Sequence, residues 1–184
     1  LFKQDGDTIL GCYHNTRSLW NIAYHPGKNS LYVPFHDQCL SMTANMASPY
    51  GFGPRFGVMR PGIDPDTYMG IAKIDMATGE MRVIYSQAQP TNGSALTTAG
   101  DLVFFGDLNR RLRALDADDG TVLWETEVPE SRRIAIMRDC GSMAVDDQFL
   151  YVASGKQCLA LEVKTGKVAK RFSFPAEDDC CHSG

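Results

Sequence analysis

Short runs of aliphatic, aromatic and β-branched residues recur along the chain, and each run follows a cluster of turn-forming residues. Three turn-and-run units of this kind lie at 26–35, 99–106 and 146–154. Such short runs, bounded by Gly, Pro, Asn and Asp, are typical of β-strands. No segment shows the 3.6-residue apolar period of an amphipathic helix. The pattern therefore predicts an all-β protein.

A second repeated unit follows these runs and reads as a short strand, an acidic turn closed by glycine, and another strand. It occurs at 73–83, 114–124 and 160–170. Gly120 stands 41 residues after Gly79 and 46 residues before Gly166. We expect these glycines at turn positions with positive φ, which glycine adopts at little cost.

A period of about 40–45 residues with several strands in each repeat is the signature of a β-propeller blade. The repeats predict four-stranded antiparallel sheets, about three to four of them, whereas a closed propeller needs about four to eight blades. We therefore expect the chain to pair with another polypeptide or to belong to a larger protein.

A segment rich in Met, Gly and Pro, residues 40–68, interrupts the first unit. Its length and composition predict an inserted loop, and loops this long in compact domains are usually functional or disordered. Two interpretations stay open: a packed loop over a pocket mouth, or a loop that covers a propeller face or a subunit contact.

Composition narrows the function classes. The 184 residues are 43% hydrophobic and carry a formal net charge of −4, which disfavours a nucleic-acid partner because such binding needs a basic field. No apolar run approaches the roughly 20 residues of a transmembrane helix. Six cysteines without a CxxC pair indicate disulfides in an oxidising compartment rather than a zinc site.

Three segments resemble the quinoprotein alcohol dehydrogenases, which depend on pyrroloquinoline quinone (PQQ). The Ala-x-Asp-x-x-x-Gly-x-x-x-Trp run from Ala114 to Trp124 resembles their tryptophan-docking motif. Residues 91–108 resemble their late-blade signature, and residues 18–34 resemble an Asn-Trp…Ala-Tyr-x-Pro…Leu-Tyr-x-Pro segment. The resemblance covers most of residues 10–166.

This resemblance implies an eight-bladed propeller, of which residues 1–184 would be the C-terminal portion of a single domain. It implies alcohol oxidation in the periplasm by hydride transfer to PQQ beside a calcium or lanthanide ion, with electrons passed to a cytochrome. The catalytic aspartate and the metal ligands would lie upstream, in an N-terminal remainder of the propeller on the same or a separate chain. We expect no catalytic residue and no metal ligand within these 184 residues.

The resemblance places cofactor contacts in two short segments. In the first, Trp20 takes the family's tryptophan position and Leu19 its usual asparagine position if one residue is missing before Tyr24. Without that gap, Ser18 takes the asparagine place and Leu19 the tryptophan place, and Asn21 is a possible substitute for the amide. The alternative role of Trp20 is a core tryptophan between blades.

In the second segment, Asn92 and Gly93 match the family's loop, and Thr91 replaces a frequent tryptophan. Gly93 permits close approach of backbone to a flat cofactor. The alternative is a tight entry turn to a strand. Trp124, by contrast, is expected to dock between neighbouring blades.

The cysteines and the remaining polar clusters carry further hypotheses. Some family members bridge the positions of Cys12 and Cys39, so the resemblance implies a disulfide there. Cys140 and Cys158 flank a strand hairpin and are a second possible pair, and the Cys180–Cys181 pair lies in an acidic tail. His25 is expected as a surface turn residue, while His36 is a candidate pocket residue.

Two arginine groups are either ion-paired loop residues or a docking patch for an acidic electron acceptor. They consist of Arg110, Arg111 and Arg113, and of Arg132, Arg133 and Arg138.

Two other functions compete with the dehydrogenase. The chain is alternatively part of a non-catalytic propeller scaffold of the bacterial envelope, which shares the docking repeat, or a quinoprotein relative that has lost its cofactor. The long insertion and the two cofactor-contact segments favour the enzyme.

Overall fold

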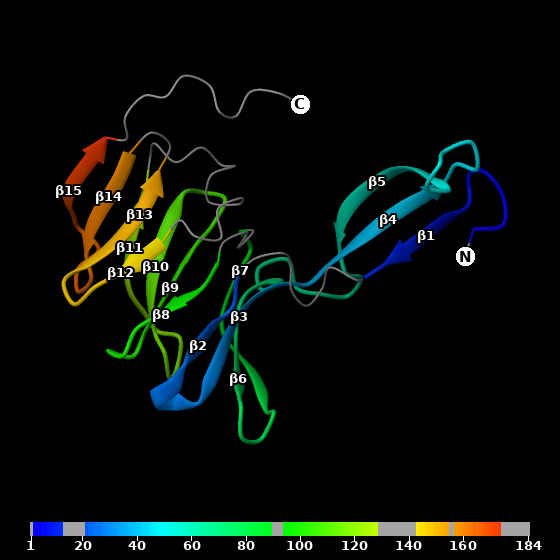
Figure 1. The fold of residues 1–184 in the computed structure, drawn as a ribbon. Coiled ribbons are helices and arrows are strands. Elements are labelled where there is room, and N and C mark those ends of the chain that lie inside the picture. The colour runs from blue at the N-terminus through cyan, green and yellow to red at the C-terminus, as the bar shows by residue number, and fades with distance from the viewer. Residues whose placement is uncertain (1, 13–20, 90–93, 129–142, 155–156, 174–184) are drawn as a thin grey trace.

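The computed structural model describes residues 2–12, 21–89, 94–128, 143–154 and 157–173, and the structural statements below concern these ranges. Within them the chain consists of β-strands, turns and one three-residue 3-10 helix, Pro26–Lys28 (Figure 1). The all-β prediction is confirmed. The described residues contain no helix long and apolar enough to cross a membrane.

Three four-stranded antiparallel sheets form the body of the chain, and the strands of each follow one another in sequence order, apart from the excursion within the first. Blade 1 consists of β2 (Ala23–His25), β3 (Ser30–His36), β6 (Met69–Asp75) and β7 (Met81–Gln87). Blade 2 consists of β8 (Leu96–Thr97), β9 (Leu102–Gly106), β10 (Arg111–Asp116) and β11 (Val122–Glu127). Blade 3 consists of β12 (Met143–Val145), β13 (Phe149–Ser154), β14 (Gln157–Glu162) and β15 (Val168–Ser173). The predicted propeller blades are confirmed.

The glycine turns join the last two strands of each blade. Gly79, Gly120 and Gly166 have φ values of 74°, 80° and 67°. In all three turns the glycine N–H donates to the carbonyl of the acidic residue four positions earlier, over 2.8–3.0 Å. The predicted positive φ is confirmed, and the repeated bond explains why the acidic turn keeps its length. We call the end of the blades that carries these turns the turn end, and the opposite end, where β2 and β8 begin, the entry end.

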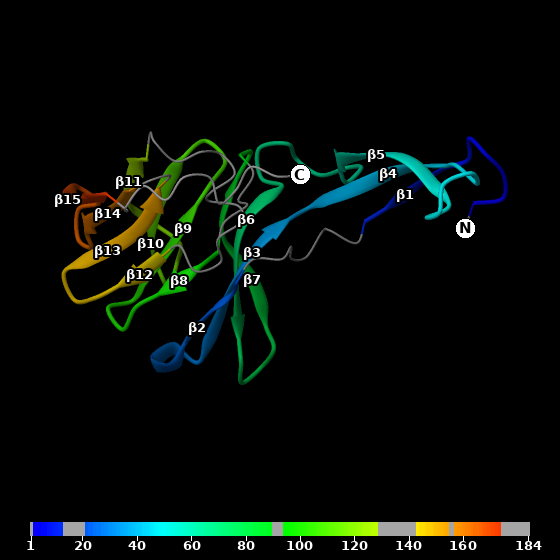
Figure 2. The ribbon, with the colours of Figure 1, turned by 45° about the horizontal axis from the view of Figure 1, so that its top comes forward.

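Blade 2 is buried on both faces because it lies between its two neighbours (Figure 2). Alternate residues of a strand point to opposite faces, so Val103 and Phe105 join the core shared with blade 1, while Phe104 joins the core shared with blade 3. All three side chains are fully buried. Two inter-blade cores therefore hold the chain together.

Trp124 on β11 docks on the glycine turn of blade 3. Its side chain is buried, its Nε1 donates to the Val163 carbonyl over 2.8 Å, and its ring centroid lies 5.7 Å from that of Phe104. A Cβ on Gly166 would lie 2.4 Å from the indole, so only glycine fits beneath the ring. The predicted docking role of Trp124 is confirmed.

Gly120 and Gly79 provide a matched pair for the first prediction. Both have positive φ, so Gly→Ala incurs about 1 kcal/mol of backbone strain at either site. A Cβ on Gly120 would also lie 1.9 Å from the Ile84 carbonyl oxygen in blade 1, whereas a Cβ on Gly79 would meet nothing within 4 Å. We expect Gly120→Ala to destabilise the protein by a further 1–3 kcal/mol or so, measured as the difference in unfolding free energy from Gly79→Ala. Equal losses would show that blade 1 moves away from the turn at no cost.

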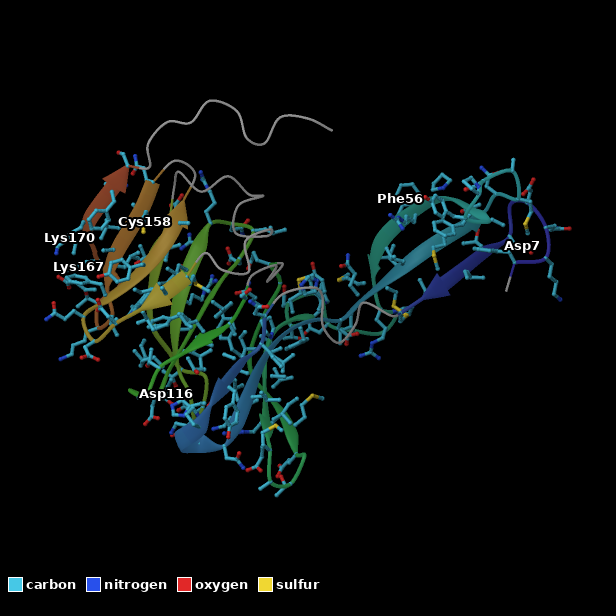
Figure 3. The ribbon with its side chains drawn as sticks, viewed as in Figure 1. Asp7, Phe56, Asp116, Cys158, Lys167 and Lys170 are labelled. Atoms are coloured by element: carbon cyan, nitrogen blue, oxygen red, sulfur yellow. A yellow bond between two sulfur atoms is a disulfide. The ribbon has the colours of Figure 1, made fainter. Side chains whose placement is uncertain are left out.

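An additional three-stranded sheet, the arm, projects from blade 1 (Figures 1 and 3). It consists of β1 (Thr8–Gly11), β4 (Gln38–Ala44) and β5 (Phe52–Met59), in the spatial order β1-β4-β5. One of its faces leaves large side chains in solvent: Leu10 and Phe56, which flank Ser41 in the register, are 47% and 65% exposed. The Cys12–Cys39 disulfide that the resemblance implies is present and joins the end of β1 to β4 at the base of the arm.

The arm corrects the description of residues 40–68 as an inserted loop. Most of β4 and all of β5 lie in that segment and pair with each other as a hairpin, while β1 pairs with the other edge of β4. The side chains of Arg60 and Asp37 form an ion pair where the hairpin leaves β3 and returns toward β6. The sequence did not indicate this sheet because one of its strands, β1, lies about thirty residues before its partner β4, and no local pattern marks β1 as a strand of the same sheet.

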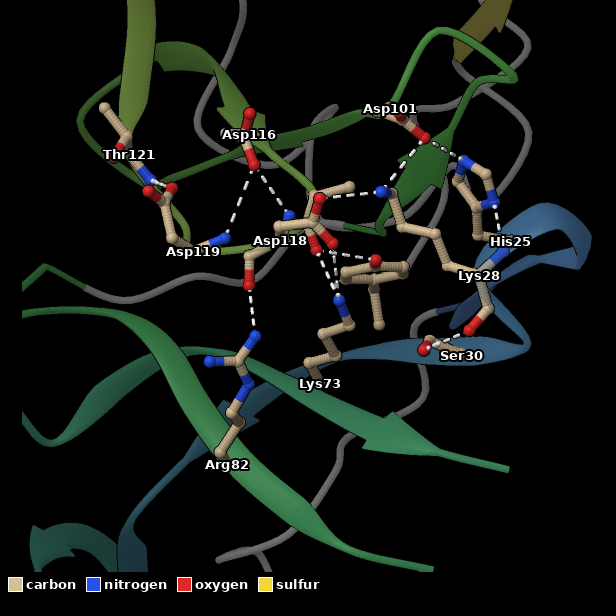
Figure 4. Close-up of polar contacts among 12 residues, drawn as sticks. His25, Lys28, Ser30, Lys73, Arg82, Asp101, Asp116, Asp118, Asp119 and Thr121 are labelled. Carbon is tan, nitrogen blue, oxygen red and sulfur yellow. Dashed lines mark hydrogen bonds and ion pairs between the residues drawn. The ribbon is translucent and has the colours of Figure 1, made fainter. Parts of the chain in front are cut away.

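A charged network crosses the turn end from blade 1 to blade 2 (Figure 4). The Asp118 carboxylate accepts from Lys28 Nζ at 2.7 Å and from Lys73 Nζ at 3.1 Å. Arg82 donates to the Asp118 carbonyl, and the buried Tyr32 hydroxyl donates to the Ala117 carbonyl over 2.7 Å. Basic side chains of blade 1 therefore hold the glycine turn of blade 2, while the Lys28 and Lys73 bonds hold the pKa of Asp118 below its ordinary value of 3.8.

A lowered folded-state pKa makes the contribution of Asp118 dependent on pH. Its stabilisation is complete above the pKa of the unfolded chain, near 4, and is lost as the pH falls through the folded-state value. We expect Asp118→Asn to lower stability by less than about 1 kcal/mol at pH 6, since the carboxylate is largely exposed, and to have no effect at a pH well below 3. Thermal melts at both pH values measure this. Glu80→Gln is the control, because Glu80 lines the same surface cavity as Asp118. If Asp118→Asn is still less stable than the wild type in acid, its effect does not come from the charge of this carboxylate.

Candidate cofactor-facing site

The two segments that the resemblance assigns to the cofactor border residues that contact each other. Ser18, Leu19 and Trp20 of the first segment, and Thr91, Asn92 and Gly93 of the second, lie outside the described residues. Asn21 and Ser94, which come directly after them, are described. The Asn21 N–H donates to Ser94 Oγ over 3.2 Å, and the Ala95 N–H donates to the Asn21 carbonyl over 3.1 Å. The structure therefore brings Asn21, the last candidate residue of the first segment, against Ser94, the residue after the second segment.

The first strands of blades 1 and 2 make this contact possible. Asn21 leads into β2 and Ser94 leads into β8, and both strands run from the entry end. Ala23 and Ala95 are buried between them in the core shared by the two blades. Their small side chains let the two backbones approach. Thr97 Oγ1 donates to the Tyr24 carbonyl over 3.2 Å farther along the same strands.

A buried ion pair lies at the same end of the blades. Asp107 follows β9 directly and is fully buried, and Arg113 on β10 is 5% exposed. Arg113 Nη1 donates to Asp107 Oδ2 over 2.7 Å, and Arg113 Nε donates to Glu125 Oε2 over 2.7 Å. The other Asp107 oxygen accepts from the Asn109 and Arg111 N–H groups, over 2.8 and 3.1 Å.

Blade 1 closes over this pair. The guanidinium of Arg113 lies 5.9 Å from the ring centroid of Tyr85 and 5.7 Å from that of Phe105, within cation–π range. Gln87 bridges the two residues: its Nε2 donates to Asp107 Oδ2 over 3.4 Å, and its Oε1 accepts from the Tyr85 hydroxyl over 3.0 Å. Burial raises the pKa of Tyr85 above its ordinary value. Both Asp107 oxygens are occupied, so this carboxylate positions the loop after β9 rather than acting as a base.

The arginines of this region are ion-paired. Arg110 contacts Glu127, Arg111 contacts Glu125, and Arg113 contacts Asp107 and Glu125. Of the two interpretations of this group, the structure supports ion-paired residues rather than a free basic patch for an acceptor. Arg132, Arg133 and Arg138 lie outside the described residues.

The histidine and cysteine hypotheses have mixed outcomes. His25 is only 4% exposed, so its description as a surface turn residue is wrong. Asp101, in the turn between β8 and β9 of blade 2, lies against it, with Oδ1 3.2 Å from His25 Nε2 (Figure 4). His36 is buried at the end of β3. Cys158 is a free thiol, so it forms no disulfide with Cys140. Cys140 and the pair Cys180–Cys181 lie outside the described residues.

The described residues include no group of three or more His, Cys, Asp or Glu side chains placed to hold a metal ion. At the entry end, the described residues bring together backbone and hydroxyl groups of Asn21 and Ser94, and the Asp107–Arg113 ion pair lies at the same end of the blades. Sequence reasoning did not single out Asp107 and Gln87. The available signal was the Asp-x-Asn turn after a fully apolar strand, 102–106, which is typical of an aspartate that accepts from the backbone.

Comparisons with known proteins agree with this architecture. A family profile, PQQ_2, described as "Outer membrane protein assembly factor BamB", matches residues 62–178. Methanol dehydrogenase [cytochrome c] subunit 1 of Methylobacterium organophilum is 32% identical over 163 residues, covering 84% of this chain and 24% of that protein. Lupanine 17-hydroxylase [cytochrome c] of a Pseudomonas species is 30% identical over 140 residues, covering 73% of this chain and 19% of that protein.

A solved structure shows the same fold. Quinohemoprotein alcohol dehydrogenase ADHIIG of Pseudomonas putida HK5 superimposes with a TM-score of 0.50 at 20% identity, over 76% of this chain and 22% of that one. The chain spans about a quarter of the methanol dehydrogenase subunit that it matches. Because the family profile covers more than half of the sequence, the chain belongs to the PQQ_2 family of β-propeller repeats, and its resemblance to the propeller of the PQQ-dependent alcohol dehydrogenases is confirmed.

Proposed function

We propose that this chain forms part of the cofactor-binding propeller of a quinoprotein dehydrogenase. The whole protein oxidises an alcohol, or a related hydroxyl or aldehyde substrate, by hydride transfer to PQQ and passes the electrons to a cytochrome-type acceptor. The cytochrome c-linked methanol dehydrogenase and lupanine 17-hydroxylase among its relatives support this proposal. The catalytic aspartate and the ligands of a calcium or lanthanide ion belong to the part of the propeller upstream of this chain.

The observation that carries the proposal is the contact between Asn21 and Ser94. Asn21, the last residue of the first motif, and Ser94, the residue after the second motif, are 73 positions apart and lie side by side at the entry end of neighbouring blades. Asn21 is exposed, and a carboxamide side chain carries both a donor and an acceptor, which suits a flat molecule bearing carbonyl and carboxylate groups.

Each residue of the set has a distinct proposed task. The Trp20 indole offers a flat apolar surface, and Asn21, Asn92 and Thr91 offer polar atoms at the edge of a flat ligand. Gly93 lets the backbone come close. When bound, PQQ supplies the hydride acceptor, and the metal ion polarises it. The part played by this chain is to bind and orient the cofactor.

A second function has its own support. The matching family profile carries the description of an outer membrane assembly factor, so a non-catalytic propeller scaffold of the bacterial envelope is the alternative. Both functions imply a periplasmic location, which the cysteine content and the Cys12–Cys39 disulfide favour.

Cofactor content distinguishes the two functions. Native mass spectrometry and an absorbance spectrum of the intact purified protein should show a complex heavier than this 20.3 kDa chain that carries the mass of PQQ and a metal ion. Addition of PQQ and Ca²⁺ should give saturable binding if the cofactor is lost on purification. A protein that neither carries nor binds PQQ would contradict the dehydrogenase and leave the scaffold or a quinoprotein relative that has lost its cofactor.

A further inference from the structure

A cavity of about 600 Å³ lies between blades 2 and 3 at the turn end, away from the entry end that carries Asn21 and Ser94. It is lined by the β8–β9 turn and the start of β11 in blade 2, and by the β12–β13 turn and the glycine turn of blade 3. Every residue that lines it lies within the described ranges. Cavities of this size are typical of sites for small molecules.

One wall of the cavity is apolar and comes from both blades. Leu102, Leu123 and Trp124 belong to blade 2, and Val163 belongs to blade 3. The Trp124 Nε1 already donates to the Val163 carbonyl, so the indole offers a ligand only apolar contact. This wall suits an aliphatic group.

Two opposite charges line the same cavity without partners. Asp147, in the β12–β13 turn, and Lys164, in the glycine turn, are exposed, and neither side chain forms a hydrogen bond or ion pair with any described residue. The neighbouring Asp146 differs, because its carboxylate accepts from two backbone N–H groups of its own turn and from the Tyr151 hydroxyl. The cavity therefore presents one carboxylate and one ammonium group that are available to a ligand.

The corresponding turn of blade 2 keeps its charge paired. Asp118 occupies the position of Lys164, two residues after the first acidic residue of the glycine turn, and Lys73 of blade 1 pairs with it over 3.1 Å. Blade 2 has Ala114 at the position of Lys73, two residues before that acidic residue, and alanine is too short to reach the next blade. Among the described residues, Lys164 thus lacks the partner that the fold provides between blades 1 and 2.

We propose that this cavity binds a small zwitterion with an aliphatic side chain, of the class of an α-amino acid such as leucine. Asp147 accepts from its ammonium group, Lys164 donates to its carboxylate, and the apolar wall receives its side chain. Thr98 also lines the cavity, and its Oγ1 is shielded from solvent without a hydrogen-bond partner among the described residues. A polar ligand group beside this hydroxyl would offset the cost of leaving it unpaired.

Three ligands of similar size separate the two charges. Leucine carries both, isoamylamine is leucine without the carboxylate, and isocaproate is leucine without the ammonium group. Binding of each to the intact protein is measured by isothermal titration calorimetry at neutral pH and fixed ionic strength. We expect leucine to bind saturably with a Kd of about 1 mM, and each analogue to bind roughly threefold more weakly or worse.

Variants assign each charge to its partner. Lys164→Met should weaken leucine binding about threefold and leave isoamylamine within about twofold, because the amine has no carboxylate to lose. Asp147→Asn should weaken leucine and isoamylamine alike and leave isocaproate no weaker. Lys167→Met is the control, because Lys167 lies in the same hairpin but outside the cavity lining. Since Asp147 and Lys164 are exposed and unpartnered, thermal midpoints should stay within about 3 °C of the wild type.

Each other outcome overturns the inference. A protein that does not bind leucine saturably has no such site. Isoamylamine that binds as tightly as leucine would indicate a cation site, and isocaproate that does so would indicate an anion site. Leucine binding that is unchanged in both Lys164→Met and Asp147→Asn would take place elsewhere on the protein. None of these results depends on PQQ, so the inference and the proposed function fail separately.

Discussion

Replacing Trp124 with alanine should lower the free energy of unfolding by about 3–5 kcal/mol, the usual cost of truncating a buried aromatic side chain. The indole contributes to the core between blades 2 and 3, where it contacts Phe104 and covers Gly166. Its truncation also leaves the Val163 carbonyl without the donor that it has at 2.8 Å. Two losses therefore coincide at one residue, a cavity and an unpaired acceptor. Denaturant unfolding of the intact protein, followed by circular dichroism, measures the change.

Leu123→Ala is the matched control, because this neighbour on β11 is 50% exposed. We expect it to change stability by less than about 1 kcal/mol. Trp124→Phe should fall between the two, since it keeps much of the apolar contact and loses the hydrogen bond. A loss below about 1 kcal/mol for Trp124→Ala would mean that blade 3 is not held by this residue.

The blades were predictable from sequence because their signals are local and repeated. Gly79, Gly120 and Gly166 each close an acidic turn that forms within seven residues, so the turn can be recognised from local sequence without knowledge of the rest of the fold. Trp124 was predictable for the same reason, from its fixed distance to Gly120.

The arm and the buried pair were not predictable because they depend on distant partners. β4 gains its second neighbour from β1, about thirty residues earlier, and no period or turn links the two. His25 precedes a Pro-Gly turn of a type that is usually exposed, yet it is buried and contacts Asp101 in the β8–β9 turn of blade 2. Arg113 belongs to a basic cluster in sequence, and only the fold shows that Asp107 and the ring of Tyr85 enclose it.

The candidate site stays a prediction, because six of its seven residues lie outside the described ranges. The two motifs indicated residues 18–21 and 91–93, and the structure adds that Asn21 contacts Ser94, the residue after the second motif. Ser94 could not be singled out in advance, because this hydrogen bond joins two different blades.

Arg113→Met should be as destabilising as the loss of Trp124, at about 3–5 kcal/mol, because it leaves the fully buried Asp107 carboxylate without its cation. Among the described residues, the remaining donors to the Asp107 carboxylate are two backbone N–H groups and the Gln87 amide, and the Gln87 amide is 3.4 Å away. Arg111→Met is the matched control. Arg111 contacts the same Glu125, but its side chain is 47% exposed, so its removal should cost less than about 1 kcal/mol.

The double variant Asp107→Asn/Arg113→Met separates the charge from the packing. It leaves no buried ion, and Asn keeps an oxygen for the Asn109 and Arg111 N–H groups. Its stability should therefore exceed that of Arg113→Met alone, even though it carries one more substitution. If the double variant is instead the less stable protein, the cost of Arg113→Met comes from the lost contacts with Tyr85 and Phe105, and the ion pair adds little. The sign of this difference in stability therefore decides whether the ion pair with Asp107 or the contacts of Arg113 with the rings of Tyr85 and Phe105 stabilise the entry end of blade 2.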